Sequence, residues 1–172
     1  MASPGNEAVL AARVSNAGLI ARVVGMLVVL PATLLSNLHS LFALGIRWYV
    51  SYQFLASGWL KITSWETTIS LFENEYHTPV LPPHLAAVIG TFGELFFPAL
   101  LVVGLTSRLS AVAVFCVNAM AVISYWHVLS TEGFEAALGQ HYFWGFMLVV
   151  LVVYGPGRLS LDALLAPRAA KI

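Results

Sequence analysis

The chain has 172 residues, of which 59% are hydrophobic and only 9% are charged, and its formal net charge is zero. A soluble domain has about 25% charged residues, so this composition argues against a soluble globular protein and predicts an all-α membrane protein. The zero net charge argues against nucleic acid as a partner, because neutralising phosphates requires a basic surface.

Four segments are long and apolar enough to cross a lipid bilayer as helices, which takes about 20 residues each. In chain order they cover about residues 40–60, 84–105, 109–129 and 135–155. A fifth apolar run, at 19–35, contains Arg22 and Pro31 and is short for a span. We expect it to form an N-terminal interfacial helix, with a spanning helix as the alternative. The sequence therefore predicts a single membrane domain, 1–172, built as a four-transmembrane-helix bundle.

The loop after the first expected span has a pattern of its own. Trp65, Ile69, Phe72 and Tyr76 recur at helical spacing, which predicts a short amphipathic outer helix. With four spans, the side of the membrane that holds both termini receives nearly all Lys and Arg residues, and the other side receives Lys61 alone. The positive-inside rule then predicts that both termini are cytoplasmic.

Three strongly polar residues fall at membrane depth: Arg47, Glu94 and Asn118. In antiparallel spans they reach similar depth, so we expect a buried Arg47–Glu94 pair with the Asn118 amide bonding nearby, because an unpaired charge there is costly. Two interpretations stay open. The pair is a finished structural bond that fixes helix register, or it forms one wall of a site that binds a polar head group or relays a proton.

Four of the five histidines fall on the outer side: His77, His84, His127 and His141. Imidazole binds Zn²⁺ or Cu²⁺, but no two of these residues have tight ligand spacing, so a metal site is only weakly indicated. Glu94, His141, Tyr142 and Trp144 form the alternative, a possible quinone or proton site. Cys116 is the only cysteine, so the chain has no thiol pair for redox exchange.

Three motifs in order resemble the DoxX family of small integral membrane proteins. They are "FLASGWLKITSW", "GELFFPALLVVGLTSRLSA" and "YGPGRLSLD". Together they lie within about residues 40–162. The positions that carry over as recurring polar and turn positions are Arg47, Gly58, Lys61, Glu94, Arg108, Asn118, Gly155, Pro156 and Gly157.

The resemblance implies a bacterial inner-membrane protein and leaves three functions open. The first is an accessory subunit, without turnover of its own, that docks a protein partner of a redox, oxidative-stress or metal-handling system. The second is a quinone-linked oxidoreductase subunit, as in thiosulfate:quinone systems, with quinone as its cofactor. The third is a small transporter or metal-binding protein. The stretch "LFENEYHTPVLPPHLAAVIGTFGEL" is similar to a subgroup found alongside iron-dependent peptide-modifying enzymes of metal-stress systems.

Overall fold

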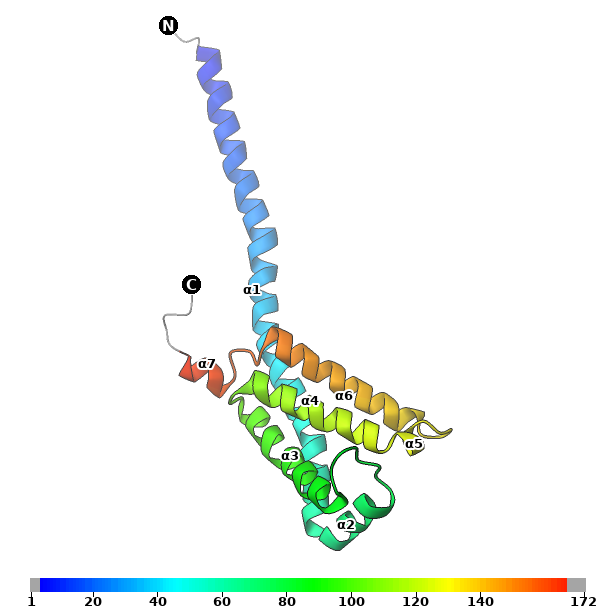
Figure 1. The fold of residues 1–172 in the computed structure, drawn as a ribbon. Coiled ribbons are helices and arrows are strands. Elements are labelled where there is room, and N and C mark those ends of the chain that lie inside the picture. Colours follow the sequence, from blue (N-terminus) through cyan, green and yellow to red (C-terminus); the bar gives the residue numbers. More distant parts are fainter. Residues whose placement is uncertain (1–3, 167–172) are drawn as a thin grey trace. The chain divides into compact units, whose positions relative to one another are not determined.

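The computed structural model describes residues 4–166, and within that range the chain is all-helical. Its helices, labelled in Figure 1, are α1 (Pro4–Thr63), α2 (Trp65–Asn74), α3 (Pro83–Val103), α4 (Ser107–Ser124), α5 (Trp126–Leu129), α6 (Glu135–Tyr154) and α7 (Leu161–Leu165). Contacts divide the chain into two compact units, residues 1–39 and residues 40–172.

Helix α1 includes both the segment expected at the membrane interface, 19–35, and the first expected span, 40–60. The sequence predicted two helices here, but residues 36–39 contain neither glycine nor proline, and nothing interrupts the helical backbone. Most side chains of 19–35 lie outside the described residues, so its place in the interface stays a prediction.

Among the described residues, three helices, α3, α4 and α6, are long and apolar enough to cross a membrane. Much of their surface consists of exposed Phe, Val, Leu and Ile side chains, as expected of helices that face lipid. They agree in position with the last three predicted spans, except that α4 ends at Ser124 instead of 129. Helix α4 ends here because the Ser124 carbonyl accepts a hydrogen bond from the backbone N–H of His77. The short helix α5 follows at Trp126–Leu129.

The core of the 40–172 part lies between α3, α4, α6 and the C-terminal half of α1. Val50 and Phe54 of α1 pack there with fully buried residues of the other three helices: Leu101, Val114 and Leu148. A second cluster joins Phe72 of α2 to the start of α3. The short predicted outer helix is therefore present as α2 and forms a lid over one end of the bundle. We refer to α2, the loop 75–82 and α5 together as the lid end.

The opposite end, which we call the arginine end, contains Arg47, the turn 104–106 and the segment 155–160. Gly104 ends α3 with φ of 75°, a conformation that favours glycine. A Cβ atom at this position would lie 2.6 Å from the Ser160 Cβ and 2.8 Å from Arg47 Nη2. Glycine is thus required here both for the turn and for the close approach of the arginine.

Candidate functional site

Arg47 and Glu94 do not form the predicted pair. The Arg47 side chain is 1% exposed and donates hydrogen bonds to four backbone carbonyls at the arginine end. The acceptors are Leu101 at 2.9 Å, Val102 at 2.7 Å, Pro156 at 3.1 Å and Leu159 at 2.7 Å. The last carbonyls of a helix lack intrahelical partners and carry partial negative charge, so a cation is stabilised there.

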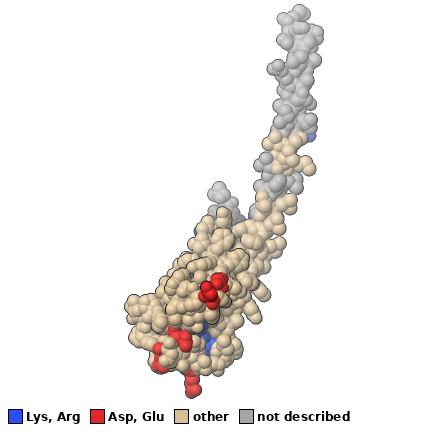
Figure 2. Space-filling model, turned by 90° about the vertical axis from the view of Figure 1, so that its right-hand side faces the viewer, with Lys and Arg blue, Asp and Glu red and all other residues tan. Residues whose placement is uncertain are grey.

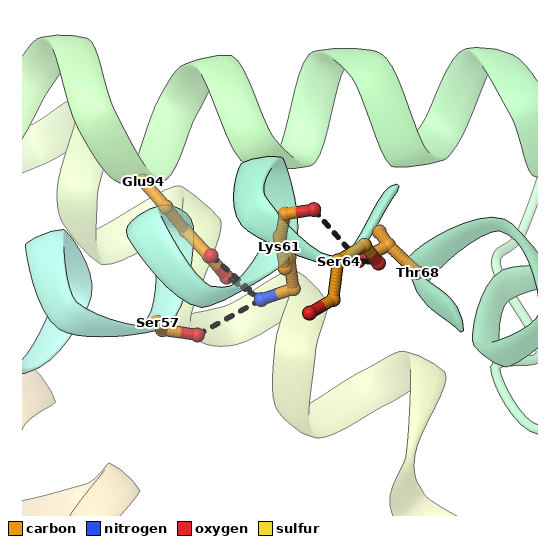
Figure 3. Close-up of polar contacts among 5 residues, drawn as sticks. All are labelled: Ser57, Lys61, Ser64, Thr68 and Glu94. Carbon is orange, nitrogen blue, oxygen red and sulfur yellow. Dashed lines mark hydrogen bonds and ion pairs between the residues drawn. The ribbon is translucent and has the colours of Figure 1, made fainter. Parts of the chain in front are cut away.

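Glu94 pairs with Lys61 instead, at the other end of the bundle (Figure 3). The Lys61 Nζ donates to both carboxylate oxygens of Glu94, at 2.7 and 2.6 Å, and to the Ser57 hydroxyl at 2.9 Å. The comparison of residue depths within the predicted spans does not include Lys61, because the predicted first span ends at residue 60. Helix α1 continues to Thr63, and Lys61 lies about one turn beyond Gly58, where α1 and α3 approach closely.

The ion pair is nearly enclosed. The side chains of Lys61 and Glu94 are 14% and 10% exposed. Gly58 permits this enclosure, since a Cβ atom there would lie 2.8 Å from the Leu95 Cγ. The Thr68 hydroxyl of the lid helix donates to the Lys61 carbonyl at 3.0 Å, which attaches α2 directly to the turn that carries the lysine. The pair is therefore held from both sides, by the bundle and by the lid.

A cavity of about 200 Å³ borders the ion pair and has a mixed polar and apolar lining. Besides Lys61 and Glu94, it is lined by Gln53, Tyr76, His141 and Trp144, among others. We refer to it as the polar cavity. Two of the predicted quinone-site residues, His141 and Trp144, thus meet Glu94 at one cavity. Tyr142 does not join them, because its exposed side chain lines a separate groove on the outside of α4 and α6.

Two aromatic side chains shape the polar chemistry of this cavity. Burial, the charge of Glu94 and the neighbouring Tyr125 raise the pKa of Tyr76, so its hydroxyl stays protonated and can donate a hydrogen bond. The indole N–H of Trp144 is buried and has no hydrogen-bond partner in the described structure. An orphaned donor of this kind costs about 1–3 kcal/mol.

A second cavity, of about 340 Å³, begins on the other side of the ion pair. We refer to it as the apolar groove. It runs between α3 and α4 under the lid, and its lining includes Phe72, Gly90, Phe97 and Met120. The two cavities share the side chains of Lys61, Tyr76 and Glu94. The charge pair therefore marks the boundary between a polar compartment and an apolar one.

Asn118 bonds His141 rather than the charged residues. Its Nδ2 donates to the His141 carbonyl at 2.9 Å, and its Oδ1 lies 2.8 Å from the His141 Nδ1. Both residues were singled out in the sequence, but in different predicted sites. The structure joins them because α4 and α6 are antiparallel neighbours on either side of one turn.

The weak metal candidates do not gather. His77 and His127 are in ring contact, with centroids 4.3 Å apart. His84 is bonded to Glu73, and His141 to Asn118. Among the residues that the structure describes, no three His, Cys, Asp or Glu side chains are grouped so as to hold a metal ion.

Asp162 completes the arginine end by accepting hydrogen bonds from the backbone N–H groups of Thr106 and Ser107, both at 2.7 Å, at the start of α4. Partial burial by itself raises the pKa of Asp162, but these hydrogen bonds and the nearby Arg47 outweigh it, and the pKa is lowered. A lowered pKa means that the stabilisation is present above the pKa of the unfolded chain and is lost as pH falls through the folded-state value.

We therefore expect Asp162→Asn to lower the free energy of unfolding by about 1–2 kcal/mol near neutral pH, because the cap loses its charge. The difference from wild type should shrink as the pH falls below about 4. Thermal unfolding in detergent across this range measures both effects, with the exposed Glu132→Gln as the control. A constant difference between Asp162→Asn and wild type across the range would contradict the assignment.

The fold and the site define a helical membrane protein with a buried ion pair between two ligand-sized cavities. The model of the DoxX family matches residues 42–127, half of the chain, and the chain belongs to this family. The matched segment contains both Lys61 and Glu94. Searches of curated proteins and of solved structures gave no match.

Proposed function

We propose that the chain is the membrane subunit of a redox system and that it binds a quinone at the Lys61–Glu94 pair. The observation that carries the proposal is the position of this pair between the polar cavity and the apolar groove. Of the three functions left open by the sequence, a cavity that reaches Glu94 favours the second or the third. The apolar groove beside it favours the second, because a quinone carries a hydrocarbon tail. A pair that only fixed helix register would need no cavity on either side.

The polar cavity suits the head group of a quinone. A quinone carbonyl oxygen accepts hydrogen bonds, and the Tyr76 hydroxyl lines the cavity as a donor. The Lys61 ammonium also lines it, and would share one of the three N–H groups that it now donates to Glu94 and Ser57. The Phe54 ring contacts the Trp144 ring at 5.7 Å and adds an apolar wall. Ligand sites commonly combine such apolar walls with a few polar groups that fix orientation.

The apolar groove suits the isoprenoid tail of the same molecule. The groove shares Lys61, Tyr76 and Glu94 with the polar cavity, and most of the other residues that line it are apolar. A molecule with a polar ring and a hydrocarbon tail matches both compartments at once. A small polar solute would leave the groove unused, and a simple hydrocarbon would leave the donors unpaired.

Reduction of a quinone to its quinol consumes electrons and protons in equal number. We propose that a redox protein partner supplies the electrons and that Glu94 and His141, which both border the polar cavity, pass the protons. The predicted link to a metal-stress or oxidative-stress system concerns the identity of that partner and stays a prediction.

We further propose that the second half of α1 is the fourth span and that the lid end faces the outside of a bacterial inner membrane. The lid end carries the carboxylates of Glu66, Glu73 and Glu75, and Glu132 and Glu135 lie just after α5. Figure 2 shows acidic side chains gathered in the lower part of the visible face, below an almost uncharged surface. Arg47, Arg108 and Arg158 lie toward the other end, which the positive-inside rule assigns to the cytoplasm together with both termini.

Titration of the purified protein with a short-tailed benzoquinone tests the proposal, with tryptophan fluorescence as the readout. We expect saturable quenching that is strongly reduced in Trp144→Phe, since this indole lines the cavity. In Gly90→Leu the added side chain should enter the apolar groove and weaken binding of a long-tailed quinone about tenfold or more, and that of a tail-less quinone much less.

Gly139→Leu is the matched control, because the space around Gly139 is open and it lines neither cavity. It should leave both affinities unchanged. Quenching that never saturates, or that is the same in Trp144→Phe, would contradict the proposed site. That result would favour the accessory subunit that binds no ligand.

A further inference from the structure

The hydrogen bonds of Asn118 fix where the proton of the His141 ring lies. The His141 backbone carbonyl can only accept, so the Asn118 atom that faces it at 2.9 Å is the amide nitrogen. The amide oxygen is then the atom that faces the His141 Nδ1 at 2.8 Å. An oxygen acceptor requires a donor opposite, so Nδ1 carries a proton.

A neutral imidazole that is protonated at Nδ1 has a lone pair at Nε2. Within the described residues, no side chain or backbone group is hydrogen-bonded to the His141 Nε2. The ring of His141 borders the polar cavity and is wedged against Trp144, with ring centroids 5.0 Å apart. The ring also borders the groove on the outside of α4 and α6, and its Nε2 is a hydrogen-bond acceptor without a partner among the described residues.

The carboxylate of Glu94 also lines the cavity. Each of its oxygens already accepts one hydrogen bond from the Lys61 ammonium, whereas the His141 Nε2 accepts none within the described residues. Gln53 also lines the cavity, but its amide both donates and accepts and so does not discriminate between ligands. His141 is therefore the residue through which the cavity distinguishes a ligand that carries a hydroxyl from one that does not.

We infer that Asn118 is a positioning residue that holds His141 in its Nδ1–H tautomer, and that the site consequently favours the quinol over ligands without a hydroxyl. This inference rests on the proposed function. The quinol hydroxyl donates to Nε2, while its other oxygen accepts from the Tyr76 hydroxyl. Asn118 is 5% exposed, both of its hydrogen bonds are to His141, and it does not line the polar cavity, so it acts through His141.

The tautomer is tested in the protein alone by nitrogen NMR of histidine-labelled protein, with His141→Gln to assign the signal. We expect a proton on Nδ1 and none on Nε2 in wild type at mildly alkaline pH. In Asn118→Leu the ring should lose this preference and populate the Nε2–H form. Asn74→Leu makes the same change on the exposed lid helix and should leave the signal unchanged. An Nε2–H ring in wild type overturns the inference, whether or not the Asn118 variant folds.

Selectivity is tested with a short-tailed benzoquinol and its dimethyl ether, which has the same shape but no hydroxyl. In wild type we expect the quinol to bind about tenfold more tightly, the effect of one hydrogen bond. In Asn118→Leu the ratio should fall toward one, with the ether binding as in wild type. Equal affinities of the two ligands in wild type overturn the inference and leave the proposed function standing. If neither ligand nor the quinone binds, the proposed function fails, and the selectivity fails with it.

Discussion

Replacing Arg47 by methionine is expected to lower the free energy of unfolding by about 3–5 kcal/mol. The substitution leaves four backbone carbonyls at the arginine end without their donor. Each buried acceptor that loses its partner costs about 1–3 kcal/mol, and removing a buried charge offsets part of the sum.

Arg108→Met is the matched control for this prediction. Arg108 lies at the same end, but its side chain is exposed and makes a single long contact of 3.5 Å with the Val153 carbonyl. Its replacement should cost less than about 1 kcal/mol. Denaturant titration in detergent measures both variants. If Arg47→Met were as stable as Arg108→Met, the role of Arg47 in joining α1 to α3 and the 155–160 segment would be wrong.

The second large effect concerns the ion pair. Lys61→Met leaves the Glu94 carboxylate unpaired at 8% exposure and should cost about 3–5 kcal/mol. Glu94→Leu should cost less, because the flexible lysine side chain can turn its ammonium toward the lid end. The double variant Lys61→Met/Glu94→Leu should recover most of the loss, since paired apolar residues often replace a buried ion pair without penalty.

A double-mutant cycle on the free energy of unfolding measures this coupling. We expect a coupling energy of about 2–3 kcal/mol, well above the 0.5 kcal/mol scatter of independent sites. Additive effects of the two single substitutions would contradict the direct contact between Lys61 and Glu94.

The sequence was a good guide to the spans but not to the charge pairing. Helices α3 and α6 agree with their predicted spans because long apolar runs end at clear turn residues, such as Gly104 and Gly155. Glu94 was recognised as a residue in need of a partner, and Lys61 stood among the motif positions. The sequence did not predict that Lys61 pairs with Glu94. The lid helix α2 lies between them in the chain, and the sequence does not show that α1 continues past residue 60.

The Asn118–His141 contact depends on a helix end that the sequence does not show. The two residues lie at about equal distances along the chain from the connection between α4 and α6 because α4 ends at Ser124, and the predicted end at 129 places them out of register. Arg47 could not have been placed from the sequence either. Its acceptors are backbone carbonyls of α3 and of the 155–160 segment, and carbonyl positions leave no residue-specific signal in a sequence.

The end of α4 at Ser124 could not be predicted from the sequence either. Nothing in "SYWHVLS" is a strong helix breaker, and the helix stops because a backbone group from the distant loop 75–82 takes the Ser124 carbonyl. Tertiary contacts of this kind override local helix preference, which is weak for any single residue. The end of α4 also bears on the polar cavity, because Tyr125, which lines that cavity, lies between α4 and α5.

The central claim is that the Lys61–Glu94 pair forms part of a quinone site, and the quinone affinity of the double variant Lys61→Met/Glu94→Leu tests it most directly. This variant is expected to fold, so a change in binding reports on the site and not on stability. We predict affinity at least about tenfold weaker than wild type, because the cavity loses its charged donor. A folded double variant that binds the quinone as tightly as wild type would contradict the claim.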